Sequence, residues 1–367
     1  MLPYLLLLFI SFITPLVFYR PKPAISPNGL NKLILKRNRM MLLIFFVGFF
    51  VLLALRDISV GNDLEEYQLI FDRCIKMPFN KLQDLRWEIG YTFYNKFVSF
   101  ISKDFRFLLI ITAIIILIPI YKLYSKEGKY NILLILLFIN MPCFLIIFSG
   151  LRQAIAISIG VVAYMAIENK KYIFSAIMII LAVLFHISAV VLILLYPMFF
   201  LRIKMKHLLY IVPIMLIVYI FRIPLLLTLF KVLPENYLFA YSEIEGTGAY
   251  GMIILFLIFL VFSFVILDET IMSSNDYFMR NALLAATMFQ FFVPVHGLIQ
   301  RASYYFLIFV PLAIISVVQA PKKKLKNISN LAVVVMVCFF AMYFFFHAAY
   351  STDNLLGVFP YKFFWSN

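Results

Sequence analysis

Charged residues are scarce in this chain. Only 13% of its 367 residues are Asp, Glu, Lys or Arg, whereas 65% are apolar. A water-soluble domain is about one quarter charged and about half apolar. A shortage of this size excludes a large soluble domain, because the apolar excess needs a solvent other than water. The many apolar stretches of roughly 20 residues or fewer therefore predict a protein embedded in a membrane.

Cysteine and histidine are also few. The three cysteines, Cys74, Cys143 and Cys338, form no CxxC pair, which excludes a disulfide framework and a cysteine-based zinc site. The four histidines show no metal-ligand spacing such as HExxH. Residues 246–251 fit GxGxxG, but they follow no strand and open no βαβ unit, so they do not predict a dinucleotide site. We therefore expect neither a metal nor another cofactor.

The apolar stretches predict an all-α polytopic membrane protein with about twelve transmembrane helices in one domain, residues 1–367. The first stretch has no basic residues before it and no small-residue cleavage site after it, so it is expected to be a retained helix. We divide residues 172–201 at His186, because one long helix would bury the polar residues there in lipid. The expected spans are residues 2–19, 40–55, 105–121, 131–148, 151–167, 172–185, 187–201, 208–221, 250–267, 281–295, 302–319 and 328–347.

Lys and Arg exceed Asp and Glu by 15, but they fall in short clusters between the spans. Such clusters fix the topology of a membrane protein and do not indicate nucleic acid as a partner. With twelve spans, all five clusters lie on the cytoplasmic side and both termini lie outside. Residues 56–104, 222–249 and 348–367 are then the outer segments, and the first is expected to form short helices on the membrane surface. The five basic clusters are residues 20–39, 122–130, 168–171, 202–207 and 320–327.

Two arginines at the expected outer face suit an anion. Arg152 and Arg301 each lie in the first turn of a helix that runs inward, where the helix dipole and the exposed N–H groups favour negative charge. The guanidinium group also matches the geometry of phosphate. The alternative is that each arginine only extends its side chain to the membrane surface. Gln153 and His296 lie beside them at the same face.

Three further residues could carry a proton. His186 lies at the expected outer hairpin, and a histidine can act as a base near neutral pH, although a lone histidine there is also often a packing residue. Gly61 predicts a tight turn that orients Asp63. Glu88 lies in the same outer segment, where a carboxylate is usually only a surface group.

Several stretches of the chain resemble the EpsG/Wzy family of bacterial polysaccharide polymerases. The most specific are Leu151-Arg152-Gln153 with Ala156, and His186 at its spacing from them. The others are Arg56 with Val60-Gly61-Asn62-Asp63 and Tyr67, Glu88-Ile89-Gly90-Tyr91, Arg301 with Tyr304-Tyr305, and Pro360-Tyr361.

This resemblance implies a GT-C-like glycosyltransferase of the bacterial cytoplasmic (inner) membrane that uses no metal. It would join oligosaccharide repeat units carried on undecaprenyl pyrophosphate, for O-antigen, capsule or exopolysaccharide. Arg152, Arg301 and Arg56 would bind the pyrophosphate, and the base would be His186, Asp63 or Glu88, with His186 ranked first. A chain-length regulator would be a further partner.

Two other functions stay open from the sequence. A flippase or transporter of lipid-linked oligosaccharides would need charges or broken helices near the middle of the bilayer. The candidate polar residues within the expected spans are Asn140 and Gln290, without an evident ion pair. A membrane acyltransferase that modifies surface glycans would take its donor from the cytosol. Its reactive residues should therefore lie near the inner face, where this chain has mainly Lys and Arg.

Overall fold

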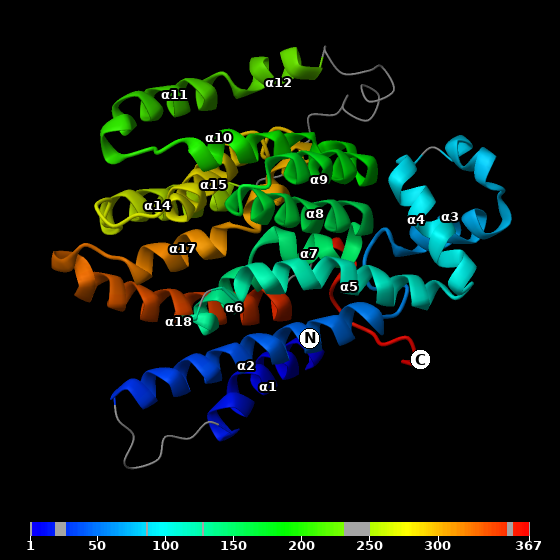
Figure 1. The fold of residues 1–367 in the computed structure, drawn as a ribbon, viewed down its shortest axis with the longest axis horizontal. Helices are drawn as coiled ribbons and strands as arrows, with labels where there is room; N and C mark the ends of the chain where they lie inside the picture. The colour runs from blue at the N-terminus through cyan, green and yellow to red at the C-terminus, as the bar shows by residue number, and fades with distance from the viewer. Residues whose placement is uncertain are drawn as a thin grey trace. The chain divides into compact units, whose positions relative to one another are not determined.

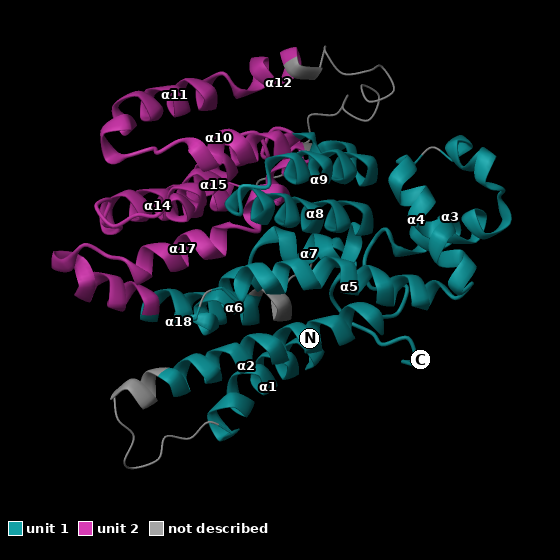
Figure 2. Cartoon of the chain, in the orientation of Figure 1, with its two compact units in different colours: residues 1–190, 334–367 teal, residues 191–333 magenta. Residues whose placement is uncertain are grey.

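In the computed structural model, helices are the regular secondary structure of the described residues, which are 2–18, 27–85, 87–126, 128–230, 250–350 and 355–366. Only two isolated β-bridges occur in these ranges. The chain divides into two compact units, residues 1–190 with 334–367 and residues 191–333 (Figure 2). The helical class predicted from the sequence is therefore confirmed.

Within the described ranges, five helices are long and apolar enough to cross a membrane, or seven if two bent helix pairs each count as one span. Four further apolar helices are shorter, with 10–17 residues. The chain is thus a membrane protein, whereas the twelve spans and the external termini stay predictions. The five long spans are residues 32–54, 105–124, 151–168, 299–319 and 323–346, and the bent pairs are residues 131–149 and 205–228.

The first unit contains ten consecutive helical elements and the closing part of the chain (Figure 1). Its helices are α1 (Leu2–Phe18), α2 (Pro27–Ala54), α3 (Leu64–Lys76), η1 (Phe79–Asp84), α4 (Ile89–Ile101), α5 (Phe105–Tyr124), α6 (Asn131–Ile139), α7 (Pro142–Ser149), α8 (Leu151–Glu168), α9 (Tyr172–Phe185), the later part of α18 (Lys326–Tyr350), and η6 (Leu355–Gly357).

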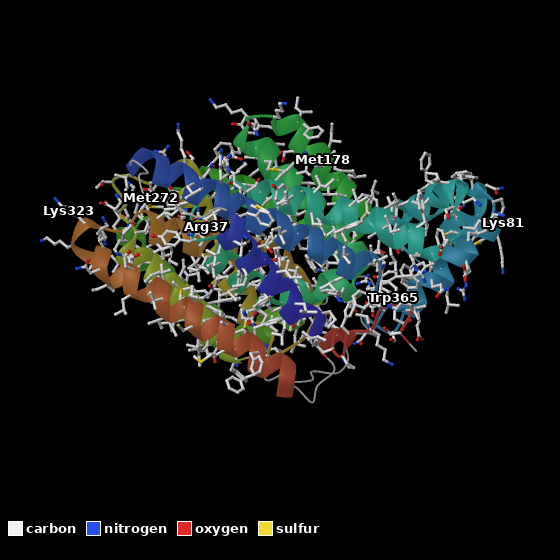
Figure 3. The ribbon with its side chains drawn as sticks, turned by 90° about the horizontal axis from the view of Figure 1, so that it is seen from below. Arg37, Lys81, Met178, Met272, Lys323 and Trp365 are labelled. Carbon is white, nitrogen blue, oxygen red and sulfur yellow. The ribbon has the colours of Figure 1, made fainter. Side chains whose placement is uncertain are left out.

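Two opposite ends of this unit differ in charge. The Asn38 side chain donates to the Gly128 carbonyl, and Lys126 pairs with Glu168. These bonds gather the described parts of the basic clusters 20–39, 122–130 and 168–171 at one end. The ends of α2 and α9 and the start of α8 lie at the other. Arg37 is toward the basic end, whereas Lys81 and Trp365 are toward the other (Figure 3).

Aromatic rings fill the interior of the first unit. Phe49 stacks on Phe144 with 5.0 Å between ring centroids, and Phe138 meets Phe144 edge to face at 5.7 Å. All three are almost fully buried. The break between α6 and α7 lies beside this core, and Asn140 at the break donates to the carbonyls of Leu136 and Phe340. Asn140 thus supplies hydrogen bonds to backbone carbonyls at a break in the helix, where the regular bonds between helix residues are interrupted.

The helix boundaries confirm two predictions from the sequence. α9 ends at Phe185, and His186 has an extended backbone before the 3-10 helix η2 (Ile187–Leu194). Gly61 has a φ of +113°, and a Cβ atom there would lie 2.7 Å from the Phe148 carbonyl oxygen. The tight turn predicted at Gly61 therefore also permits close contact with the end of α7.

The second unit has its own basic end. Arg280 donates to the Ile203 carbonyl and to Glu269, and the amide of Lys322 donates to the Ile266 carbonyl at 2.8 Å. These bonds place the basic clusters 202–207 and 320–327 at the same end. The helices are α10 (Leu195–Phe200), η3 (Met205–His207), α11 (Leu208–Ile220), α12 (Arg222–Phe230), α14 (Tyr250–Ile266), α15 (Ser274–Gln290), α16 (Leu298–Leu307), α17 (Val310–Gln319), η5 (Lys323–Leu325) and the start of α18.

The expected outer segments are described to different extents. Residues 56–104 form the short helices α3, η1 and α4, as predicted, although their place on a membrane surface is untested. Residues 231–249 of the second segment, most of the GxGxxG match and residues 351–354 of the third segment lie outside the described residues. The prediction of one domain, residues 1–367, also stays a prediction.

Candidate active site

Glu88 lies between two basic side chains in the first unit. Its Oε2 atom accepts a hydrogen bond from Nη1 of Arg152, and its Oε1 atom lies 2.9 Å from Nδ1 of His186. All three side chains are largely but not fully buried. Sequence analysis had selected these residues separately, and the structure joins them through one carboxylate.

Glycine permits the contact between Glu88 and His186. Glu88 directly precedes α4, and His186 directly follows α9. A Cβ atom on Gly90 would lie 2.6 Å from the carbonyl oxygen of Leu184, closer than real Cβ atoms come to other atoms. Only glycine therefore lets the start of α4 approach the end of α9 this closely.

Arg152 reaches the site from the first turn of α8, which begins directly after Gly150. Its guanidinium group lies over the Trp87 ring, with 4.0 Å from Cζ to the ring centroid. Trp87 also stacks with Tyr91 at 5.8 Å and meets Tyr67 edge to face at 5.2 Å. The aromatic side chains thus fix the plane of the guanidinium group through packing and cation–π attraction.

The surroundings of Glu88 favour its ionised form. Burial alone would raise the pKa of this carboxyl, but the hydrogen bond with His186 and the charge of Arg152 outweigh burial and lower it to about 2. Glu88 is therefore a carboxylate at physiological pH. A carboxylate with so low a pKa is a poor proton acceptor, but it orients its partners well.

The same hydrogen bond selects a tautomer of His186. An ionised carboxylate only accepts hydrogen bonds, so Nδ1 of the imidazole carries the proton that faces Glu88. In the neutral ring, Nε2 is then the basic nitrogen. The pair of Glu88 and His186 has the arrangement in which a carboxylate orients a histidine for proton transfer.

Arg56 is a second buried cation in this unit. It is 3% exposed, and its Nε and Nη1 atoms have no hydrogen-bond partner among the described residues. Burial lowers its pKa to about 10, so the group is still charged at physiological pH. Its ring neighbour is Phe148, with 5.6 Å from Cζ to the centroid, and the hydroxyls of Tyr67 and Tyr91 act on its charge. No ion pair among the described residues includes Arg56, and a buried cation without such a pair favours an anionic ligand.

Tyr67 and Tyr91 link the two arginines. Both phenols also interact electrostatically with Arg152. The hydroxyl of Tyr91 is buried without a hydrogen-bond partner in the described part of the chain. Arg56, Arg152 and these phenols therefore supply hydrogen-bond donors that converge near the Glu88–His186 pair.

The other predicted site residues have different positions. Gln153 is buried in the first turn of α8, next to Arg152. Asp63 precedes α3 and is near enough to Tyr67 for its charge to act on that phenol. His296 and Arg301 belong to the second unit, where Arg301 is in the first turn of α16 as predicted. His296 is buried after α15, and burial lowers its pKa.

Sequence reasoning quoted Tyr67 and Tyr91 without giving them a role, and it missed Trp87 and one further arginine. Trp87 and Gly90 flank Glu88 within five residues, and this clustering was the available signal. Arg222, at the start of α12, lies 4.2 Å above the Tyr219 ring but has no counterpart in the motifs noted above. Within the described residues, no group of three His, Cys, Asp or Glu side chains could hold a metal ion, and the three cysteines are free.

Comparison with known proteins gives one match. The model of the EpsG family matches residues 39–363, which include Arg56, Glu88, Arg152 and His186. No curated protein and no solved structure matches the chain.

Proposed function

Because this chain belongs to the EpsG family, whose members are polysaccharide polymerases in general, we propose that it joins repeat units carried on undecaprenyl pyrophosphate at the outer face of the bacterial cytoplasmic membrane. The observation that carries the proposal is the hydrogen-bonded cluster of Arg152, Glu88 and His186, with Arg56 near it. The cluster combines cations for a pyrophosphate with a histidine for a hydroxyl proton.

Two arginines would hold the leaving group. Departure of a lipid pyrophosphate leaves extra negative charge on the phosphate oxygens, and fixed cations in a water-poor site stabilise that charge. Arg56 is buried without an acidic partner, and Arg152 is fixed against Trp87. Both guanidinium groups can donate two parallel hydrogen bonds to a phosphate.

His186 would take the acceptor proton. The hydroxyl of the incoming repeat unit loses its proton to Nε2, and its oxygen forms a bond with the anomeric carbon of the donor. The bond between that carbon and the pyrophosphate oxygen breaks, and the electron pair leaves with the lipid pyrophosphate. The reaction is balanced without an oxidant or any other reactant.

Glu88 would orient this reaction and would not itself be the base. Its low pKa and its hydrogen bonds with Arg152 and His186 disfavour proton uptake. Asp63 is the remaining carboxylate for a supporting role, such as a hydrogen bond to a sugar hydroxyl. His296, Arg301 and Gln153 stay candidates for substrate binding.

Charge within the first unit supports action at the outer face. The cluster lies at the end opposite the residues Asn38, Lys126 and Lys170. Basic ends of membrane helices face the cytoplasm, so the cluster would face outward, where polyprenyl-linked repeat units are joined. An acyltransferase with a cytosolic donor fits this placement poorly.

The ion pairs argue against a transporter. Among the described residues, the pairs of Lys126 with Glu168, Arg152 with Glu88 and Arg280 with Glu269 lie near helix ends. A coupled transporter usually places such charges near the middle of the membrane. No observation therefore favours the flippase over the polymerase.

The direct test compares His186→Ala with a matched histidine variant, His207→Ala, at the basic end of the second unit. Purified proteins receive lipid-linked repeat units, and the products are separated by length. We expect His186→Ala to lower the turnover by about 10²–10⁴-fold, the usual range for loss of a general base, while His207→Ala keeps normal turnover.

Melting temperature separates catalysis from folding in this test. His186→Ala should melt near the wild-type temperature and still bind the lipid-linked donor. Near-normal chain extension by well-folded His186→Ala protein would eliminate His186 as the base. Asp63 would then be the next candidate for the general base.

A further inference from the structure

An apolar groove lies between α1 and α2 of the first unit. Its volume is about 560 Å³, within the range of roughly 300–1,000 Å³ that is typical of small-ligand sites. Every lining residue is apolar, including Leu6, Ile10, Leu43, Val47, Val51 and Phe363. We call this feature the α1–α2 groove.

Close packing at one point creates the groove beside it. Gly48 of α2 faces Leu7 of α1, and a Cβ atom on Gly48 would lie 2.4 Å from the Leu7 side chain. The larger side chains on either side of this contact stay apart. Leu6 and Val47 are 47% and 54% exposed, which for apolar residues of a membrane protein means exposure to lipid or to a ligand.

One end of the groove meets the candidate active site. Leu52 and Phe363 line that end. Phe363 pairs through its backbone with Arg56, and the hydroxyl of Tyr361 donates to the carbonyl of Leu52 at 2.9 Å. The groove thus runs along α2 to the residues that enclose the buried guanidinium group of Arg56.

We propose that the α1–α2 groove binds the first isoprene units of the donor's polyprenyl chain, with the pyrophosphate at Arg56 and Arg152. This inference rests on the proposed function for the identity of the lipid. Its own support is the apolar lining by α1 and α2 and the buried cation Arg56 beside one end. A single hydrocarbon chain with several negative charges at its head matches this combination.

Ordinary phospholipids match it less well. A phosphatidylglycerol molecule carries one negative charge, whereas the end of the groove lies beside Arg56, in a site that also holds the cation Arg152. Burial of a chain in the groove also removes Leu6, Val47 and Val51 from contact with mobile lipid. The groove would therefore hold the donor in a fixed direction relative to His186.

The test uses a polyprenyl pyrophosphate with a photoreactive diazirine near the head of its chain. Full-length protein in vesicles of phosphatidylethanolamine and phosphatidylglycerol is irradiated with this probe, and labelled peptides are found by mass spectrometry. We expect labels in α1 and in residues 43–52 of α2, and we expect unlabelled polyprenyl pyrophosphate to suppress them.

Two substitutions at lipid-exposed positions provide the comparison. Val47→Trp places a large ring in the groove and should weaken probe binding by about tenfold, the effect of displacing roughly two methylene groups. Ile180→Trp on α9, which is 63% exposed and lines no described cavity, should leave labelling unchanged.

Three results would overturn the proposal. Labels spread evenly over lipid-exposed helices, or suppressed equally by added phosphatidylglycerol, would mean ordinary bilayer contact. The wild-type protein could also prove to be a dimer that Val47→Trp converts to monomers without changing the labelling. The groove would then be an interface between two copies of the chain. Equal labelling of the Val47→Trp and Ile180→Trp proteins would also exclude the groove.

The labelling needs no turnover, so it is repeated in the His186→Ala protein. If the wild-type protein is labelled in α1 and α2 but shows no polymerase activity, the proposed reaction is contradicted and the groove proposal is not. Normal polymerisation without labels in α1 and α2 would contradict the groove alone.

Discussion

At the residue scale, the cluster depends on one carboxylate. Glu88 accepts a hydrogen bond from Arg152 on one oxygen and from His186 on the other. Each bond stabilises the charged form, and together they outweigh the cost of burial. The carboxylate therefore has to be ionised for the cluster to keep its geometry, and acid should disrupt it.

Glu88→Gln tests this dependence on pH. The pKa of Glu88 in the folded protein is about 2, below its ordinary value of 4.5. The ionised group therefore stabilises the fold above about pH 4.5, and this contribution is lost as the pH falls towards 2. We expect the melting temperature of the wild type to decrease over this window more than that of Glu88→Gln. Asp72→Asn, an exposed change of the same kind, should follow the wild type.

The same variant should lose activity at neutral pH. An amide can donate to Nδ1 of His186 and so favour the wrong tautomer, and such a change lowers turnover by up to about 10⁴-fold in other carboxylate–histidine pairs. Full turnover in well-folded Glu88→Gln protein would show that the carboxylate does not orient the histidine.

Arg152→Lys tests the planar group. Lysine keeps the charge but cannot form two parallel bonds to a phosphate or lie flat on Trp87. We expect turnover to decrease by about 10²-fold, similar to loss of one transition-state donor, with a normal amount of protein in the membrane. The matched control is Arg73→Lys at an exposed position of α3, for which no loss is expected. Equal chain-length distributions from both variants would mean that Arg152 has only a surface role.

At the element scale, glycines determine how the helices of the site meet. Gly61 brings the loop after α2 against the end of α7, and Gly90 brings the start of α4 against the end of α9. Neither glycine touches a substrate in the proposed mechanism. Each allows a backbone approach that a methyl group would prevent, and the geometry of Glu88 depends on the second.

Gly90→Ala and Gly251→Ala form a matched pair of variants. A Cβ atom on Gly90 would lie 2.6 Å from the Leu184 carbonyl oxygen, whereas nothing lies within 4 Å of one on Gly251. We expect Gly90→Ala to cost about 1–3 kcal/mol of stability and to reduce activity as Glu88 moves from His186. Gly251→Ala should be neutral or stabilise α14 by up to about 1 kcal/mol. Thermal melting and chain extension are the measurements, and equal behaviour of the two variants would contradict this account.

Sequence patterns predicted much of the local structure. Apolar run lengths and charge clusters gave the helical class, the break at His186 and the start of α8 at Leu151. They could not predict the bends within the helix pairs at Asn140 and Arg222, because hydropathy measures how apolar a segment is and not the direction of its helix axis. They also could not show that Glu88 joins Arg152 to His186, since the partners are 64 and 98 residues away in the chain. Only tertiary packing brings them together.

At the scale of the whole molecule, charge separates the two ends of the first unit. Lys129 lies at the basic end, near the hydrogen bond between Asn38 and Gly128, whereas Lys81 lies in η1 at the other end. The predicted orientation requires such a separation, with the basic end toward the cytoplasm.

Cysteine labelling tests this orientation. In a Cys338→Ser background, Lys81→Cys should react with an impermeant thiol reagent added outside the cytoplasmic membrane, and Lys129→Cys should not. Both positions are exposed, and the remaining native thiols are buried. Reaction of Lys129→Cys alone would invert the topology and place the candidate site in the cytoplasm.

In the proposed mechanism, the shared carboxylate would also couple donor binding to proton transfer. A pyrophosphate that draws Arg152 to itself weakens the hold of that arginine on Glu88, whose charge then acts more fully on His186. The imidazole would become a stronger base only after the donor has arrived, and by thermodynamic reciprocity a protonated imidazole would strengthen donor binding. An enzyme built in this way keeps its base weak while the site holds no donor.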